Sequence, residues 1–226
     1  MASIKGHRRK QLARSRKTSS HNRSLWMAYS PKMDTDLIIL GDLEIIHWAT
    51  HLESSPIVQA YRFDEDVDIN LDLTDVDDFS TIRGIWVENR DGSIELHQID
   101  SSEKLEPDLK SIPIRYRLID QGIRHGKLVT ITYAHLALLA YQLDFWLKVV
   151  AMASQMRSYS LAHETELVGI QVQLMKEGNI RSLLDELPIK DPAIALGVIC
   201  KLIISGSMQV QVGKHGFGYN TTWCAA

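Results

Sequence analysis

The order of apolar and polar residues is most regular between residues 67 and 73, where the two kinds strictly alternate. A period of two places one set on each face of an extended chain, which predicts a half-buried strand. Residues 57–63 read IVQAYRF and predict another strand, because β-branched and aromatic side chains fit a pleated surface. Residues 82–88 and 93–100 predict a hairpin, since the turn-forming sequence Asn89-Arg90-Asp91-Gly92 separates them.

A helix is predicted over residues 42–53, where apolar residues recur at helical spacing. Asp42 can accept hydrogen bonds from the first backbone N–H groups, and Pro56 stops the helix after Ser54-Ser55. The apolar face consists of Ile45, Trp48, Ala49 and Leu52.

Three more elements are predicted before residue 157. Residues 115–124 predict a short helix that Gly126 ends, and residues 127–133 (KLVTITY) predict a strand. Residues 134–157 are mostly apolar and contain no Pro or Gly, which predicts a long helix. Together these elements predict an α/β domain over residues 25–157, with a mixed sheet of about five strands flanked by helices.

The remainder, residues 160–226, has a different pattern. Helices are predicted at 161–176, 180–187 and 192–205, the last opened by Asp191-Pro192. A hairpin follows, in which the turn Gly213-Lys214-His215-Gly216 joins MQVQV to FGYNTTW. Three helices and a terminal hairpin are the order of a winged-helix domain, in which Lys214 could touch a phosphate.

Charge divides the chain unequally. The net charge is −3, yet residues 1–23 contain eight basic residues and no acid. The other 203 residues carry 17 basic and 28 acidic side chains. A basic arm over residues 1–24 on an acidic body predicts contact with DNA phosphates, although a solvated leader has the same composition. The basic residues of the arm are Lys5, Arg8, Arg9, Lys10, Arg14, Arg16, Lys17 and Arg23.

Composition also limits the setting of the protein. Of its 226 residues, 45% are apolar, but no unbroken apolar run reaches the roughly 18 residues that span a bilayer. Only Cys200 and Cys224 are present, so cysteine alone supplies no disulfide or zinc framework. We therefore expect a cytoplasmic protein with no membrane partner.

Two segments carry a resemblance to a known family. WMAYSPK (residues 26–32) is followed by the helix and by HLESSPIV (residues 51–58), in which Glu53 precedes a break that contains proline. This arrangement resembles the start of the TnsA family, the endonuclease subunits of heteromeric cut-and-paste transposases. The resemblance implies a restriction-endonuclease-like domain followed by a small winged-helix-like domain. It also implies, as partners, DNA, a DDE-type transposase subunit and an AAA+ ATPase regulator, in a bacterial, nucleoid-associated setting.

The same resemblance implies where the nuclease site should lie. Such nucleases hold Mg²⁺ with two carboxylates, and a lysine helps to orient or polarise the reacting groups. In the family these come from a helix glutamate, an aspartate at a strand start and a Glu-x-Lys pair after the hairpin turn. Glu53 matches the first. With the Asp91-Gly92 turn as anchor, the aspartate position falls on Gly84, beside Arg83, and the Glu-x-Lys pair falls on Gln98-Ile99-Asp100.

The resemblance therefore implies a degenerate site that lacks its second carboxylate and its lysine. Asp77, Asp78 or Asp100 could rebuild it, whereas Arg83 would repel a cation and Glu95 lies on the opposite strand face from Gln98. His47 and His51, four residues apart, could bind a metal or could be ordinary core or solvated histidines.

Three functions remain open at this point. The first is a TnsA-like subunit that binds transposon-end DNA and its protein partners without cutting. The second is an active Mg²⁺-dependent endonuclease that nicks transposon 5′ ends, with Glu53 as a metal ligand. The third is a defence effector built on the same nuclease fold.

Overall fold

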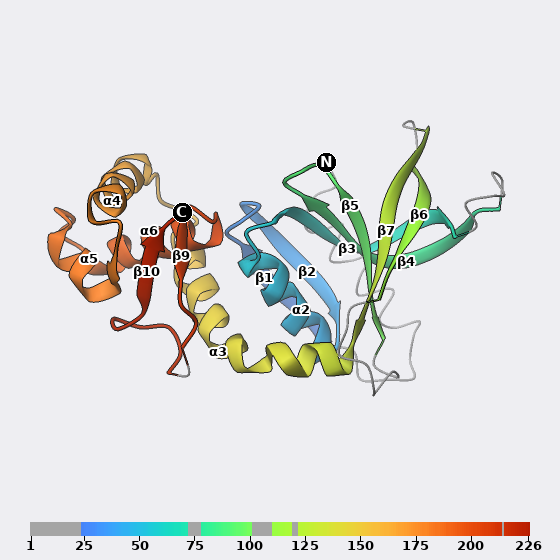
Figure 1. Cartoon of the computed structure of the whole chain (residues 1–226), viewed down its shortest axis with the longest axis horizontal. Coiled ribbons are helices and arrows are strands. Elements are labelled where there is room, and N and C mark those ends of the chain that lie inside the picture. Colours follow the sequence, from blue (N-terminus) through green and yellow to red (C-terminus); the bar gives the residue numbers. More distant parts are fainter. Residues whose placement is uncertain (1–23, 72–77, 101–109, 119–121, 214) are drawn as a thin grey trace. The chain divides into compact units, whose positions relative to one another are not determined.

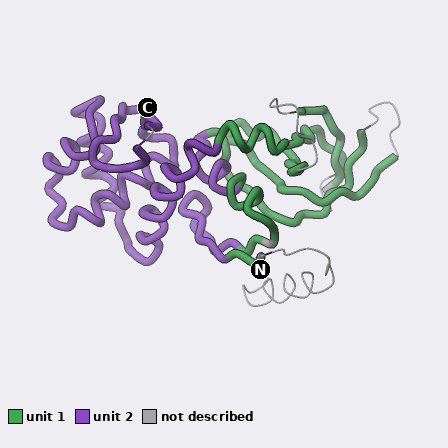
Figure 2. Tube along the Cα trace, turned by 90° about the horizontal axis from the view of Figure 1, so that it is seen from below, with its two compact units in different colours: residues 1–26, 38–48, 57–139 green, residues 27–37, 49–56, 140–226 purple. Residues whose placement is uncertain are grey.

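The computed structural model describes residues 24–71, 78–100, 110–118, 122–213 and 215–226. The basic residues predicted for the arm, Lys214 and Asp77 lie outside these residues. The described chain is mixed α/β, with five helices and a mixed sheet, which confirms the predicted class. It divides into two compact units, shown in different colours in Figure 2. The first contains Ile38–Trp48 and Ile57–Leu139, and the second contains Met27–Leu37, Ala49–Pro56 and Ala140–Ala226.

The first unit is built on a closed barrel of five strands (Figure 1). The order around the barrel is β3-β4-β5-β7-β6, and β6 returns to pair with β3. Every pair is antiparallel except β5 with β7, which run parallel. The strands are β3 (Val58–Asn70), β4 (Ser80–Asn89), β5 (Ile94–Asp100), β6 (Lys110–Leu118) and β7 (Gly122–Thr132).

Alternate residues of these strands fill the barrel. Trp86 and Tyr116 meet edge to face at its centre, with ring centroids 5.1 Å apart. The other buried members of this core are Val67, Ile69, Leu96, Ile114 and Leu128. Since the period is two, the neighbours of these residues in sequence lie on the outer face.

The two strands predicted at 57–63 and 67–73 form one long strand, β3. Its pairing with β4 shifts register between Arg62 and Glu65, and Asp64 there has φ 56°. A bulge of this kind bends a strand without ending it. The strand character of both segments was therefore predicted correctly, but the break between them was wrong.

The helix predicted at 115–124 is also wrong. Residues 115–118 belong to β6 and residues 122–124 belong to β7, and Arg115 lies opposite His125 in this pair. Buried Ile114 and Tyr116 alternate with arginines, so the local pattern has the period of a strand. Pairing of β6 with β3 and of β7 with β5 then stabilises the extended form, and such long-range pairing is not visible in a local window.

The predicted helix at 42–53 is confirmed as α2 (Leu43–Ser54), which starts directly after Asp42. A two-stranded pair precedes it, β1 (Ser24–Ser30) with β2 (Thr35–Gly41), and was not predicted. The long predicted helix is confirmed as α3 (Tyr133–Gln155).

The second unit contains the predicted C-terminal helices. These are α4 (Ala162–Met175), α5 (Ile180–Glu186) and α6 (Pro192–Ile204). The Asp191 side chain accepts a hydrogen bond from the backbone N–H of Ala193 at 2.8 Å, which confirms the predicted cap. The core surrounds α6, and Phe145 of α3 meets Phe217 edge to face at 5.5 Å.

A small antiparallel sheet completes this unit, in the order β8-β10-β9. The predicted hairpin strands are found as β9 (Met208–Val210) and β10 (Thr222–Ala225). The third strand, β8 (Glu177–Asn179), was not predicted.

By length and composition, α3 is the described helix that is apolar enough to cross a membrane, with a mean hydropathy of 1.5. However, Phe145, Val149 and Ala153 are buried in the core of the second unit. Asp144 and Lys148 form an ion pair of 2.8 Å along the same helix. Part of α3 thus packs in the core of the second unit, while 22% of its most apolar stretch is buried in the structure as a whole.

Candidate functional site

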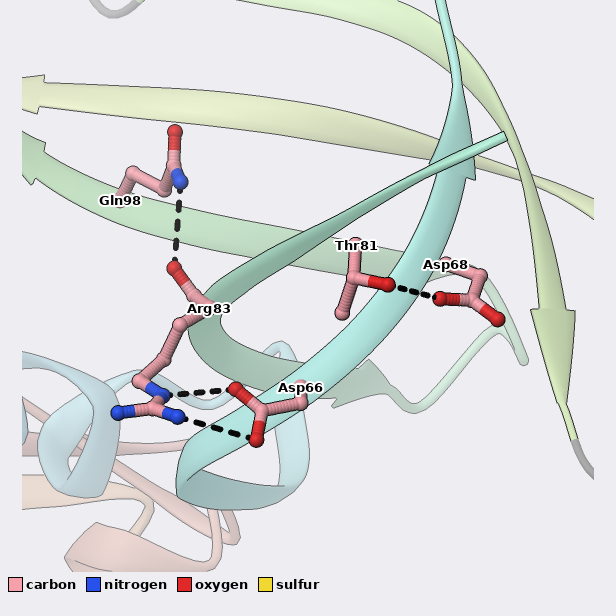
Figure 3. Close-up of polar contacts among 5 residues, drawn as sticks. All are labelled: Asp66, Asp68, Thr81, Arg83 and Gln98. Atoms are coloured by element: carbon pink, nitrogen blue, oxygen red, sulfur yellow. Dashed lines mark hydrogen bonds and ion pairs between the residues drawn. The ribbon is translucent and has the colours of Figure 1, made fainter. Parts of the chain in front are cut away.

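The barrel brings together the positions predicted for the second acid and the lysine. In the ladder of β4 with β5, Ile85 lies opposite His97, which places Gly84 beside Gln98. The Gln98 side-chain amide donates a hydrogen bond to the backbone carbonyl of Arg83 at 3.2 Å (Figure 3). Residues 84 and 98, which were both placed by counting from the hairpin turn, are thus neighbours in the structure.

These residues line a cavity of about 670 Å³ within the first unit. Its lining mixes both signs of charge, since four acids lie with two cations: Asp42, Glu44, Asp64 and Asp100 with Arg83 and Lys110. The rest of the wall is formed by small and apolar residues, Gly84, Ile85, Ile99 and Phe63 among them, and by polar residues that include His97 and Thr130. Such a cavity can hold polar groups. The resemblance implies a metal-binding aspartate at residue 84, so the space around this residue determines whether that ligand fits.

Packing excludes an aspartate at residue 84. A Cβ atom built on Gly84 would lie 2.8 Å from the backbone carbonyl oxygen of His97 and 2.9 Å from Cδ1 of Leu96. Real Cβ atoms do not approach a carbonyl oxygen this closely, so β5 would have to move. The close approach of the two strands at this point therefore requires glycine.

Arg83 has a partner on the neighbouring strand. Its guanidinium makes a two-point contact with Asp66, with Nε to Oδ1 at 2.7 Å and Nη2 to Oδ2 at 3.1 Å (Figure 3). This hydrogen bonding is the main cause that raises the pKa of Arg83. Nearby, the Thr81 hydroxyl donates to Asp68, so two β3 carboxylates are hydrogen-bonded to β4 side chains. These contacts stabilise the bulged β3–β4 pair, and Arg83 keeps its positive charge beside the cavity.

Glu53 does not line this cavity. It belongs to the second unit, where it is only 2% exposed. One carboxylate oxygen accepts a hydrogen bond from the Ser30 hydroxyl at 2.8 Å, and the other accepts one from the backbone N–H of Lys32 at 2.7 Å. Both donors come from the end of β1 and the turn that follows it. Glu53 therefore anchors this turn to the last turn of α2.

Lys32 strengthens the same junction. Its ammonium donates to the backbone carbonyl of Leu52 at 2.8 Å and also to that of Ser55. Carbonyls at the end of a helix have no intrahelical partner, and a cation there also interacts favourably with the helix dipole. The two segments that carried the family resemblance are thus in direct contact through Ser30, Lys32 and Glu53.

Among the described residues, no three His, Cys, Asp or Glu side chains are arranged to hold a metal ion. Burial is the main cause that lowers the pKa of His47, so this ring is held neutral on the side of α2. Asp100 and His51 are also candidate metal ligands from the sequence. In the described part of the chain, neither belongs to a group of three side chains that could hold a metal ion.

A buried polar chain that the sequence did not reveal crosses from α2 to β5. The indole N–H of Trp48 donates to Nδ1 of His97 at 3.1 Å, and Nε2 of His97 lies 2.8 Å from the Glu95 carboxylate. Because an indole nitrogen can only donate, Nδ1 must accept, and the His97 proton sits on Nε2. Glu95 and His97 share one face of β5 because they are two residues apart.

The hydrogen bond from His97 is the main cause that lowers the pKa of Glu95 from its usual 4.5. A lowered pKa in the folded state means that ionised Glu95 stabilises the fold above about pH 4.5, and that this stability is lost as the pH falls further. Glu95→Gln should therefore flatten the dependence of unfolding free energy on pH below 4.5. Urea denaturation between pH 3 and pH 7 measures this, with exposed Glu166→Gln as control. If the unfolding free energies of wild type and Glu95→Gln change with pH in parallel, the predicted role of ionised Glu95 is contradicted.

Comparisons with protein families, with curated proteins and with solved structures find no match for this chain. The arrangement of residues described above is therefore the basis on which a function can be proposed.

Proposed function

We propose that this chain is a TnsA-like transposition protein that binds transposon-end DNA and does not cut it. The observation that carries the proposal is the packing at Gly84. The cavity gathers the positions of the family's second acid and lysine, yet it contains Arg83, Gly84, Gln98 and Asp100. A side chain at residue 84 would collide with β5, and the carboxylate of Glu53 is engaged by Ser30 and Lys32.

The order of elements supports the finer fold assignments. A helix (α2) followed by the meander β3-β4-β5, with β7 parallel to β5, supports a restriction-endonuclease-like domain in which β6 additionally closes the sheet into a barrel. Three helices followed by the β9–β10 pair agree with a winged-helix-like second domain. Within this proposal the first domain has a structural role. It retains the cavity where the nuclease site would lie, but not the side chains that would bind the metal.

The charge distribution supports a role on DNA. Residues 1–23 contain eight basic residues and no acid. Each DNA phosphate that these residues neutralise releases counterions, which favours binding. The protein would act in the bacterial cytoplasm, associated with the nucleoid. It would hold DNA for a DDE-type transposase subunit and an AAA+ ATPase regulator, which perform the catalysis and the target control.

A plasmid nicking assay tests the absence of cutting. Supercoiled plasmid is incubated with the full chain and Mg²⁺ or Mn²⁺, with and without the transposase subunit. We expect no nicked circles above background, because a metal site needs converging oxygen ligands and Gly84 supplies none. If wild type nicks and Glu53→Gln does not, the endonuclease alternative replaces this proposal.

Binding is tested separately, by titrating a fluorescent duplex at several salt concentrations. Deleting residues 1–23 should weaken binding, and the log–log salt slope should flatten by roughly 0.9 for each phosphate that the arm no longer neutralises. A wild-type chain that binds no duplex even at low salt would overturn the DNA-binding role altogether.

A further inference from the structure

The hairpin of β6 and β7 carries a concentration of positive charge that its surroundings do not share. The two strands contain five Lys or Arg residues and one histidine, and neither contains Asp or Glu. Residues 24–226 as a whole have an acidic excess, with 17 basic and 28 acidic side chains. The basic residues of the hairpin are Lys110, Arg115, Arg117, Arg124, His125 and Lys127.

Strand register gathers four of these residues on one face. Arg115 lies opposite His125, and Pro113 lies opposite Lys127. Residues that are directly opposite in an antiparallel pair share a face, and Arg117 follows Arg115 by two residues. Ile114, Tyr116 and Leu128, which have the other parity, fill the barrel. Arg117, His125 and Lys127 therefore lie on one outward face, the basic ribbon face, with about 6.7 Å between His125 and Lys127 along β7. Arg115 has the same parity, but its Nε is buried, so it is not counted among the charges of this face.

The far end of the hairpin extends past the neighbouring strands. β5 pairs with β7 only from Lys127 onward, and β3 pairs with β6 only at Arg115–Arg117. Residues Gly122–His125 are exposed at every position, so both faces of the tip meet solvent. Figure 1 shows β6 and β7 running side by side to this tip. Arg124, which has the inward parity, is exposed for the same reason.

The charges at this end are available to a partner. No carboxylate of a described residue lies within ion-pair distance of Arg117 or Arg124, whereas Arg62 and Arg83 on the neighbouring strands are both paired. The guanidinium of Arg117 stacks over Phe79 at 4.2 Å, which fixes its position and leaves its N–H edge exposed. Asp68, opposite Arg117 on β3, accepts the Thr81 hydroxyl.

From this geometry we propose that the basic ribbon face, with Arg124 at the tip, binds the phosphate backbone of duplex DNA as the hairpin enters a groove. The proposal rests on the proposed DNA-binding function and places that contact on the folded body. A two-stranded ribbon fits the major groove, which is about 12 Å wide. Arg117 and Arg124 each present a planar guanidinium that matches two phosphate oxygens at once. The hairpin also has the form of the strands that β-ribbon proteins insert into a groove.

Two double variants of the full-length chain test the proposal. Arg117→Gln with Arg124→Gln removes two charges and one stacking contact from the hairpin. Arg181→Gln with Lys190→Gln is the matched control, because Arg181 stacks over Tyr219 at 5.6 Å and Lys190 is an exposed cation of the second unit. Circular dichroism and thermal melts confirm that both variants are folded.

Affinity for a fluorescent duplex of about two helical turns is measured by anisotropy over a series of NaCl concentrations. The hairpin variant should bind on the order of tenfold or more weakly at about 0.1 M salt, with a log–log slope reduced by roughly 1.8, which is about 0.9 for each of two phosphates. The control variant should match wild type in both affinity and slope.

The other outcomes separate this proposal from the function on which it rests. If the hairpin variant keeps the wild-type slope while deletion of residues 1–23 reduces it, DNA binding stands and the ribbon proposal is overturned. If wild type binds no duplex, both fall. If the hairpin variant loses affinity for single strands alone, or for an acidic protein partner alone, the duplex proposal is likewise overturned.

Discussion

Replacing Glu53 by alanine should lower the free energy of unfolding by about 2–4 kcal/mol, because two hydrogen bonds to a buried carboxylate are removed together. The Ser30 hydroxyl and the backbone N–H of Lys32 would both lose their acceptor in a buried place. Since Ser30 also accepts from the backbone N–H of Met33 at 3.1 Å, the whole turn after β1 depends on this residue. Urea denaturation monitored by tryptophan fluorescence measures the loss.

Glu53→Gln separates this anchoring role from metal binding. The glutamine oxygen can accept from Lys32, and its amide can donate to the Ser30 hydroxyl, which has acceptor capacity. We expect Glu53→Gln to retain more than half of the stability that Glu53→Ala loses. Exposed Glu166→Ala serves as control and should change stability by less than about 0.5 kcal/mol. Equal stability of Glu53→Ala and wild type would show that the carboxylate does not anchor the turn.

Introducing the family's aspartate at residue 84 should damage the fold and restore no activity. The new Cβ would lie 2.8 Å from the carbonyl oxygen of His97, and the new carboxylate would stand against Leu96. Overpacking of this kind costs about 1–3 kcal/mol, and repulsion between a carboxylate and a carbonyl oxygen adds to it. Gly84→Asp should therefore melt well below wild type and should not nick plasmid in Mg²⁺.

Gly218→Asp is the matched control, because nothing lies within 4 Å of a Cβ built there and Gly218 does not have positive φ. The same substitution should leave the melting temperature within about 2 °C of wild type, since exposed changes away from the core shift stability little. A Gly84→Asp variant that keeps wild-type stability and gains Mg²⁺-dependent nicking would mean that β4 and β5 can separate.

The candidate site could be predicted in part from local signals. The hairpin at Asn89-Arg90-Asp91-Gly92 was predicted from its turn residues, and the pairing of β4 with β5 that it sets brings Gly84 beside Gln98. That Gly84 has no room for a side chain could not be predicted in this way. The distance to the His97 carbonyl depends on how closely two strands approach, and the twist and bulges of the whole barrel set that approach.

In the β6–β7 hairpin the strand pattern was present in the sequence, but it was interpreted as a helix. Ile114 and Tyr116 alternate with Arg115 and Arg117, which is a strand pattern. Pro113 and Gly126 at the borders suggested the start and end of a helix instead. The basic ribbon face was missed for this reason, because in a helix the same residues would have scattered around the axis.

The sequence by itself determined the elements whose signals are local. α2 begins after Asp42, α6 begins with the Asp191 cap and Pro192, and the β4–β5 hairpin turns at Asp91-Gly92. Capping and turn formation involve residues only a few positions apart, so the sequence specifies them directly.

Only the tertiary structure decided the contacts between distant segments. Glu53 was placed by the resemblance as a candidate metal ligand, whereas its donors in the structure are Ser30 and Lys32, which lie 23 and 21 positions away in the chain. Closure of the barrel by β3 with β6, and the bond from Trp48 to His97 that continues to Glu95, likewise join segments far apart in sequence. The energy of such contacts comes from burial and from hydrogen bonds that exist only once the segments have packed together.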